Sequence, residues 1–420
     1  MSPPSVSRLG RPLAALMDQA VVSGTSFLAT VLVGRFAGEQ QLGLYSLGFT
    51  LIILACGVQE SLVVIPYTVF APRAADERRT RFAASTLLQS VVASLAMSVC
   101  LAVGGLALTA PRLPQFAPVV TVLLAAVPTI LLREFARRFE FAQMRFAASL
   151  VIDGAVAAAQ LALLVTLAVS GKLSAAAALA IHGGCCCVVG LAWLWIGRRR
   201  FSLARGEIAS DWRQSWGLGS WLLAGHVTGI TQAYALHWCL AFVLGAAATG
   251  EFAAAVTIVS LANPLIIGVG NLLMPVTAHT FAQSGAAGVW RLALRSTYWL
   301  AAGLAWFSLS AAFAGDQVLA IIYGRQFGGQ TSTVTLLALA ISVAALGLSA
   351  EHGLRASDRP RAIFAANFLA LVVTLGLAAC LVPTHGNLGA ATSLLAGNVV
   401  GCVMRWWAFR FWILDRQEHA

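Results

Sequence analysis

Apolar residues are arranged along the chain in long runs that short polar segments separate. Most runs are close to twenty residues long, the length of helix that crosses the ~30 Å hydrocarbon layer of a bilayer. They predict twelve membrane-spanning helices, at residues 12–36, 42–70, 83–109, 116–134, 147–170, 174–197, 217–245, 251–280, 293–315, 332–352, 362–383 and 387–412. Because the connecting segments are short, no soluble domain is expected.

The composition agrees with this pattern. Of the 420 residues, 59% are hydrophobic and only 10% are charged, whereas a typical soluble domain has about 25% charged residues. A chain so poor in charge cannot cover itself with a solvated surface. The sequence therefore predicts an all-α integral membrane protein.

Basic residues indicate the orientation of the spans, because short cytoplasmic segments of membrane proteins are enriched in them. If the N-terminus is cytoplasmic, the outer segments hold only four of the 27 basic residues, Arg35, Arg112, Lys172 and Arg325. We therefore expect both termini to be cytoplasmic. The basic residues behind the net charge of +11 then form a collar at the cytoplasmic face, where they meet anionic lipid headgroups. No nucleic-acid partner is therefore expected.

Neither metal chemistry nor nucleotide chemistry is expected. The adjacent Cys185, Cys186 and Cys187 lack metal-ligand spacing, and no histidine follows at a suitable interval. The stretch GRFAGEQQLGLYSLGF at residues 34–49 is glycine-rich, but no Lys-Ser/Thr pair follows it, so it is not a phosphate-binding loop. We interpret it as the outer turn between the first two spans, and we predict no cofactor.

The chain repeats itself at about half its length. Residues 42–46 (LGLYS) correspond to residues 249–253 (TGEFA), and residues 171–176 (GKLSAA) correspond to residues 386–391 (GNLGAA). We expect two six-helix halves, residues 1–205 and 206–420, with the same orientation because six spans return the chain to its starting side. Two parallel halves that face each other enclose a central cleft, which is an architecture of transporters.

The motifs at residues 34–49 and 386–391 resemble those of the polysaccharide exporters. These lipid-linked oligosaccharide flippases belong to the MATE-like multidrug/oligosaccharidyl-lipid/polysaccharide superfamily. The resemblance implies a protein of the bacterial inner membrane that moves an undecaprenyl-diphosphate-linked oligosaccharide to the outer leaflet by alternating access. Its cargo would be a repeat unit of O-antigen, for lipopolysaccharide, or of exopolysaccharide, and its partners would include other polysaccharide-assembly proteins and membrane lipids.

Two alternatives to this function stay open. Multidrug cation antiporters of the same superfamily also have twelve spans and similar halves. A membrane polysaccharide polymerase or ligase is the enzymatic alternative, but such enzymes usually carry a substantial outer loop, so we do not expect an enzyme. Relatives that flip the peptidoglycan precursor usually have fourteen spans, for which this chain has no room.

Ionisable residues inside the spans are the first candidates for function, because charge is costly in a membrane. Asp18 and Glu60 both fall in the cytoplasmic third of the first hairpin, and Gln19 lies beside Asp18. We interpret the two carboxylates as a pair that binds H⁺ or Na⁺ and couples an ion gradient to transport. The alternative is that each pairs with an arginine at the rim, and for Asp153 an ion pair with Arg145 or another collar arginine is the favoured interpretation.

The seventh predicted span carries His226, Gln232 and His237. In the repeat, His226 aligns within a residue of Asp18 and Gln19, so both halves place polar groups at a similar depth. A glutamine can hydrogen-bond sugar hydroxyls, and a histidine can carry a proton. Hydrogen bonding between helices is the alternative for these residues.

Arginine side chains are the candidates for binding the diphosphate, because the guanidinium fork matches phosphate oxygens. Arg35 lies at the outer end of the first span, where it either receives the diphosphate or extends to lipid phosphates. Arg133, Arg137 and Arg138 lie at the cytoplasmic mouth and are positioned to recruit substrate. The cytoplasmic enrichment of arginine explains them equally well without a ligand.

Overall fold

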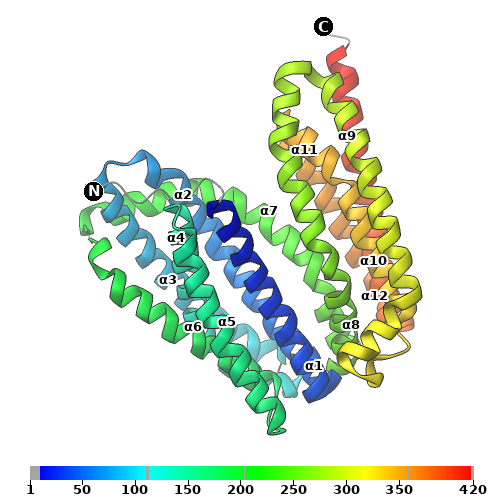
Figure 1. Cartoon of the computed structure of the whole chain (residues 1–420), viewed down its shortest axis with the longest axis horizontal. Helices are drawn as coiled ribbons and strands as arrows, with labels where there is room; N and C mark the ends of the chain where they lie inside the picture. Colours follow the sequence, from blue (N-terminus) through cyan, green and yellow to red (C-terminus); the bar gives the residue numbers. More distant parts are fainter. Residues whose placement is uncertain (1–9, 110–112, 203, 358, 418–420) are drawn as a thin grey trace. The chain divides into compact units, whose positions relative to one another are not determined.

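The computed structural model describes residues 10–109, 113–202, 204–357 and 359–417. Within these ranges the chain is helical, with short connections and no strand (Figure 1). The long helices are α1 (Gly10–Gln59), α3 (Asp76–Thr109), α4 (Ala117–Ala142), α5 (Phe146–Val169), α6 (Ala175–Gly197), α7 (Ile208–Val243), α8 (Ala246–Val259), α9 (Asn263–Tyr323), α10 (Thr331–Leu346) and α12 (Pro360–Gln417). Shorter elements are the π-helix η1 (Glu60–Val64), α2 (Ile65–Phe70) and α11 (Leu348–Ala356).

The number of membrane spans follows from the breaks in these helices. Eight helical segments of the described chain are long and apolar enough to cross a membrane. Three of them contain a glycine with non-helical backbone angles, namely Gly38, Gly285 and Gly386. Dividing those segments at the glycines gives eleven helices, and the 36-residue α7 adds the twelfth. The prediction of an all-α membrane protein with about twelve spans is confirmed.

The chain forms two compact units, Met1–Val227 and Thr228–Ala420, and the boundary between them falls inside α7. The expected halves, residues 1–205 and 206–420, describe a repeat in the sequence and stay a prediction. Each unit is considered by itself below.

Corresponding turns of the repeat share an unusual backbone conformation. Gly38 has φ 87° and ψ 174°, and Gly245, 207 residues later, has φ 94° and ψ −178°. Gly171 and Gly386, 215 residues apart, also have positive φ, at 67° and 57°. Only glycine adopts such angles without steric cost. The outer-turn interpretation of residues 34–49 therefore has a structural basis in the helix break at Gly38.

Helix α4 is the central element of the N-terminal unit, since it contacts α1, α3, α5 and α6. Its approach to α6 is especially close: a Cβ added at Gly183 would lie 2.6 Å from the Cβ of Ala126. The hydroxyl of Thr129 also donates to the carbonyl of Gly183 at 2.8 Å. Small residues at a contact allow membrane helices to pack this closely. Half of the residues of α4 are buried, Arg133 and Arg137 among them.

We predict that Gly38→Ala and Gly245→Ala each lower the free energy of unfolding by about 1–3 kcal/mol, because an alanine is strained at positive φ. Gly24→Ala is the matched control, since Gly24 lies in the helical part of α1 and has nothing within 4 Å of an added Cβ. Thermal unfolding of the purified protein, followed by tryptophan fluorescence, measures the change. Equal melting temperatures for all three variants would contradict the assignment of these glycines as obligatory breaks.

Candidate functional site

Two turns of α4 carry four charged residues, Arg133, Glu134, Arg137 and Arg138. Residues four positions apart lie on one face of a helix, so Arg133 and Arg137 project together, as do Glu134 and Arg138. Arg133 and Arg137 are each only 8% exposed. A buried guanidinium requires a carboxylate partner to offset its loss of hydration.

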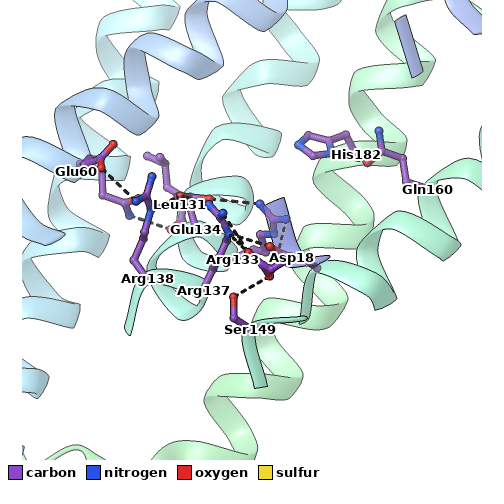
Figure 2. Close-up of polar contacts among 12 residues, drawn as sticks. Asp18, Glu60, Leu131, Arg133, Glu134, Arg137, Arg138, Ser149, Gln160 and His182 are labelled. Atoms are coloured by element: carbon purple, nitrogen blue, oxygen red, sulfur yellow. Dashed lines mark hydrogen bonds and ion pairs between the residues drawn. The ribbon is translucent and has the colours of Figure 1, made fainter. Parts of the chain in front are cut away.

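Arg137 binds carboxylates from two other helices. Its Nη2 lies 3.2 Å from Oδ2 of Asp18 on α1 (Figure 2). Its Nε lies 2.8 Å from Oδ2 of Asp153 on α5. Asp18 and Asp153 are 0% and 1% exposed. The hydroxyl of Ser149 donates to the other oxygen of Asp18 at 3.0 Å. Arg137 thus joins three helices through fully buried ion pairs.

The network extends along α4 to a more accessible edge. Arg133 reaches Oδ1 of Asp153 at 2.6 Å, and Glu134 accepts from Arg138 at 2.8 Å. Arg138 also contacts Glu60 of η1 at 3.2 Å, with the two side chains 36% and 31% exposed. The ion pairs are therefore graded from a closed core around Arg137 to a partly open contact between Arg138 and Glu60. We call the whole set the α4 network: Asp18, Glu60, Arg133, Glu134, Arg137, Arg138, Ser149 and Asp153.

The α4 network contains more carboxylates than guanidiniums. Four acidic side chains face three arginines, so that full ionisation leaves one negative charge in excess. Uncompensated charge is costly inside a membrane-spanning unit. One additional positive charge, either H⁺ or a metal cation such as Na⁺, balances the set.

Asp18 and Glu60 each bind an arginine of α4, which was the alternative interpretation of these two residues. Glu134 and the arginines connect the two carboxylates through a chain of ion pairs. Asp153 binds Arg133 and Arg137, in agreement with the favoured interpretation of an ion pair with a collar arginine, whereas Arg145 pairs with Glu140 at 3.2 Å. The role of Asp18 and Glu60 in cation binding stays a prediction.

Helix α4 extends beyond the end predicted for the fourth span. The sequence placed that end at residue 134, with the arginines at a cytoplasmic mouth, and α4 continues to Ala142. The dense charges of residues 133–140 are compatible with a helix because each one has a partner on a neighbouring helix or within a turn. Arg133 and Arg137 are consequently buried between helices, and only Arg138 reaches an accessible edge.

Polar residues of α7 mostly bond within the protein. Gln232 donates to Oδ1 of Asn398 on α12 at 3.0 Å. His237 is 3% exposed, and its ring packs edge-on against Phe252 with centroids 5.2 Å apart. His226 is partly exposed. For Gln232 these contacts favour the interpretation of a hydrogen bond between helices.

The two remaining candidates are at the surface of the described chain. Gln19 is exposed and donates to the hydroxyl of Ser23 at 3.1 Å, one turn along α1. Arg35 is exposed three residues before the break at Gly38. Neither residue belongs to the α4 network, and their proposed roles stay predictions.

Sequence reasoning missed Glu134, His182 and Gln160. Glu134 is flanked by arginines one, three and four positions away, a spacing that marks it as their common partner. Gln160 lies two turns along α5 from Asp153 and contacts Nδ1 of His182 on α6 at 2.8 Å. Figure 2 shows this pair beside the α4 network. The seven-residue spacing from Asp153 was the available signal for Gln160.

Comparison with known proteins identifies the fold. No family model matches the sequence, and no curated protein matches it. Solved structures do match. One is a multidrug resistance MATE family transporter of the MOP superfamily in an inward-facing conformation, with a TM-score of 0.79, 15% identity, and coverage of 96% of this chain and 99% of that one.

Two further solved structures have the same architecture. The lipid II flippase MurJ, in an inward closed conformation, matches with a TM-score of 0.75 and 9% identity over 95% of this chain and 87% of that one. A MOP superfamily transporter from Pyrococcus furiosus, described as having a binding pocket of reverse polarity, matches with a TM-score of 0.64 and 13% identity. The match covers 96% of this chain and 94% of that one. The chain therefore has the fold of MOP superfamily transporters.

We predict that Arg137→Gln lowers the free energy of unfolding by roughly 3–5 kcal/mol, because it leaves Asp18 and Asp153 buried without their shared counter-charge. Adding Asp153→Asn to that variant should recover part of the loss. Arg138→Gln, at the accessible edge, should cost no more than about 1 kcal/mol. Equilibrium unfolding of the purified protein measures the free energy of unfolding of all three variants. Equal losses for Arg137→Gln and Arg138→Gln would contradict the claim that the ion pairs of Arg137 are more deeply buried than those of Arg138.

Proposed function

We propose that the protein is a transporter that moves an undecaprenyl-diphosphate-linked oligosaccharide from the cytoplasmic to the outer leaflet by alternating access. The observation that carries this proposal is the α4 network, which holds three arginines inside a membrane-spanning unit. A diphosphate that crosses the apolar layer needs guanidinium groups at membrane depth. The fold adds support, since the lipid II flippase MurJ shares it.

In this scheme the substrate binds at the accessible edge of the network, where Arg138 pairs with Glu60. Without substrate, Glu60 keeps Arg138 paired, because an unpaired charge there is costly. A diphosphate oxygen that replaces the carboxylate forms charge-assisted hydrogen bonds with the same guanidinium. Glu60 then lies unpaired and is itself the carboxylate in excess over the three arginines, so it takes up H⁺ or Na⁺. Substrate binding and cation binding are coupled in this scheme through competition for Arg138.

The location proposed for this activity is the inner membrane of a bacterium, with both termini cytoplasmic and with other polysaccharide-assembly proteins as partners. In this scheme Arg35 receives the diphosphate at the outer end of the first span, which precedes the break in α1 at Gly38. The similar solved proteins are transporters and a flippase, which supports transport rather than an enzymatic polymerase or ligase role.

A multidrug cation antiporter is the second candidate function. The excess carboxylate of the α4 network favours it, because a buried negative charge attracts an organic cation as well as a proton. The similarity to a multidrug resistance MATE family transporter points the same way. The two candidates differ in the use of the arginines: a lipid diphosphate needs them as ligands, whereas an organic cation does not.

Deleting the protein from its host should reduce surface polysaccharide and cause the lipid-linked intermediate to accumulate, because the intermediate then stays in the cytoplasmic leaflet. Extraction of lipid-linked sugars, together with staining of the surface polysaccharide, measures both quantities. Unchanged polysaccharide combined with new sensitivity to cationic drugs would reverse the ranking of the two candidates.

Neutralising either carboxylate should abolish export while the protein remains in the membrane. We expect Asp18→Asn and Glu60→Gln to lower export on the order of tenfold or more. Each substitution removes a carboxylate of the cation site, and Glu60→Gln also removes the carboxylate that pairs with Arg138 in the absence of substrate. Asp76→Asn is the control, since its side chain is 96% exposed outside the network. Full export in both network variants would refute the coupling scheme.

A further inference from the structure

A second buried charge cluster lies in the C-terminal unit, on α11 and α12. Glu351 contacts two arginines, Nη1 of Arg405 at 2.8 Å and Nη2 of Arg355 at 2.5 Å. The side chains of Glu351 and Arg405 are 12% and 11% exposed, and that of Arg355 is 52% exposed. Within the part of the chain that the structure describes, neither guanidinium contacts another carboxylate. The cluster therefore has one positive charge in excess, opposite in sign to the α4 network.

Next to this cluster, His352 is buried with unsatisfied hydrogen-bonding groups. It is 8% exposed, and neither Nδ1 nor Nε2 has a hydrogen-bond partner among the described residues. Buried polar groups nearly always have a partner in native structures. Other buried polar atoms of the described chain also have no partner, but His352 is the histidine in which both ring nitrogens are unsatisfied. We take this as an indication that a partner absent from the protein itself completes the site.

Helix α9 borders His352 at Gly270. A Cβ added at Gly270 would lie 3.7 Å from Nε2 of His352, an ordinary contact distance. Arg355 lies three positions further along α11, so that it shares a helix face with His352. Ile266 and Val269 of α9, together with Leu348, pack against the apolar cluster of Leu300, Leu304 and Ala345. A cationic site with an apolar border fits a phosphate that a lipid carries better than it fits a freely soluble anion.

The roles of the two arginines differ. Arg405 is fixed: its Nε donates to the carbonyl of Gly401 at 3.2 Å, and its guanidinium fills the space above Gly347, where a Cβ would lie 2.8 Å from Cζ. Arg355 is half-exposed and bonds only to Glu351 among the described residues. If Arg355 turns away from Glu351, Arg405 still neutralises that carboxylate. Arg355 is thus the guanidinium that is available to an incoming anion.

We propose that His352 and Arg355 bind the diphosphate of the lipid-linked substrate within the C-terminal unit. This inference rests on the proposed function for the identity of the ligand. The imidazole of His352 donates one N–H to a phosphate oxygen, and Arg355 binds a second oxygen in the forked geometry that suits phosphate. Arg405 keeps Glu351 paired and so prevents the carboxylate from repelling the anion.

Binding of undecaprenyl diphosphate to the purified full-length protein in maltoside detergent tests the proposal. We expect His352→Leu and Arg355→Gln each to weaken binding about tenfold, the effect of losing one charge-assisted hydrogen bond. His279→Leu and Arg361→Gln are matched controls at exposed positions of the same unit, and they should bind as the unaltered protein does. Isothermal titration calorimetry measures the affinities.

A second readout separates binding from folding. His352→Leu removes a buried polar ring whose nitrogens have no hydrogen-bond partner among the described residues, so the melting temperature of the variant should equal or exceed that of the unaltered protein. A large loss of stability would instead show that His352 has a structural role. Competition by phosphatidylglycerol at equal concentration distinguishes a general anionic-lipid site from a diphosphate site, and full competition would overturn the proposal.

The binding measurements also distinguish failure of this inference from failure of the proposed function. Suppose that the unaltered protein binds undecaprenyl diphosphate and that both variants bind it equally well. The assignment of His352 and Arg355 then fails, while the flippase function stands. Absence of binding by the unaltered protein, together with unimpaired polysaccharide export after its deletion, would refute both.

Discussion

Charge inside a membrane-spanning unit must be paired, and the architecture of the N-terminal unit depends on how Arg137 satisfies this requirement. Its guanidinium contacts Asp18 of α1 and Asp153 of α5, so three helices meet at one buried guanidinium. Removing Arg137 leaves Asp18 buried without an arginine, which costs several kcal/mol. The central position of α4 follows from this arrangement, and so does the availability of Arg138 at the accessible edge of the network.

The two units differ in the sign of their excess charge. The α4 network has one carboxylate more than it has arginines, whereas the cluster around Glu351 has one arginine more than it has carboxylates. The first favours a proton or metal cation, and the second favours an anion. The turns at Gly38 and Gly245 share a positive φ, whereas the buried charged residues of the two units differ.

The sequence predicted the fold well because run length and glycine position are local signals. Runs of about twenty apolar residues indicate helices. The turns that correspond in the sequence repeat contain the glycines at which the helices break, such as Gly38 and Gly245. The site was harder to predict. Counting residues along the predicted spans placed Asp18 and Glu60 at a similar depth in the membrane. Such a count does not show which neighbouring helix each side chain faces. The arginines of α4 likewise indicated only a cytoplasmic mouth, since their partners on α1 and α5 cannot be recognised from α4 alone.

Reconstitution of the purified protein into liposomes gives the most direct test of the central claim, that its arginines serve a lipid diphosphate. The quantity to measure is the movement of a fluorescently labelled undecaprenyl-diphosphate oligosaccharide between leaflets, with and without a pH gradient. The account predicts movement by the unaltered protein and its loss in Arg138→Gln, although that variant stays folded. Transport of an organic cation with no movement of the lipid would contradict it.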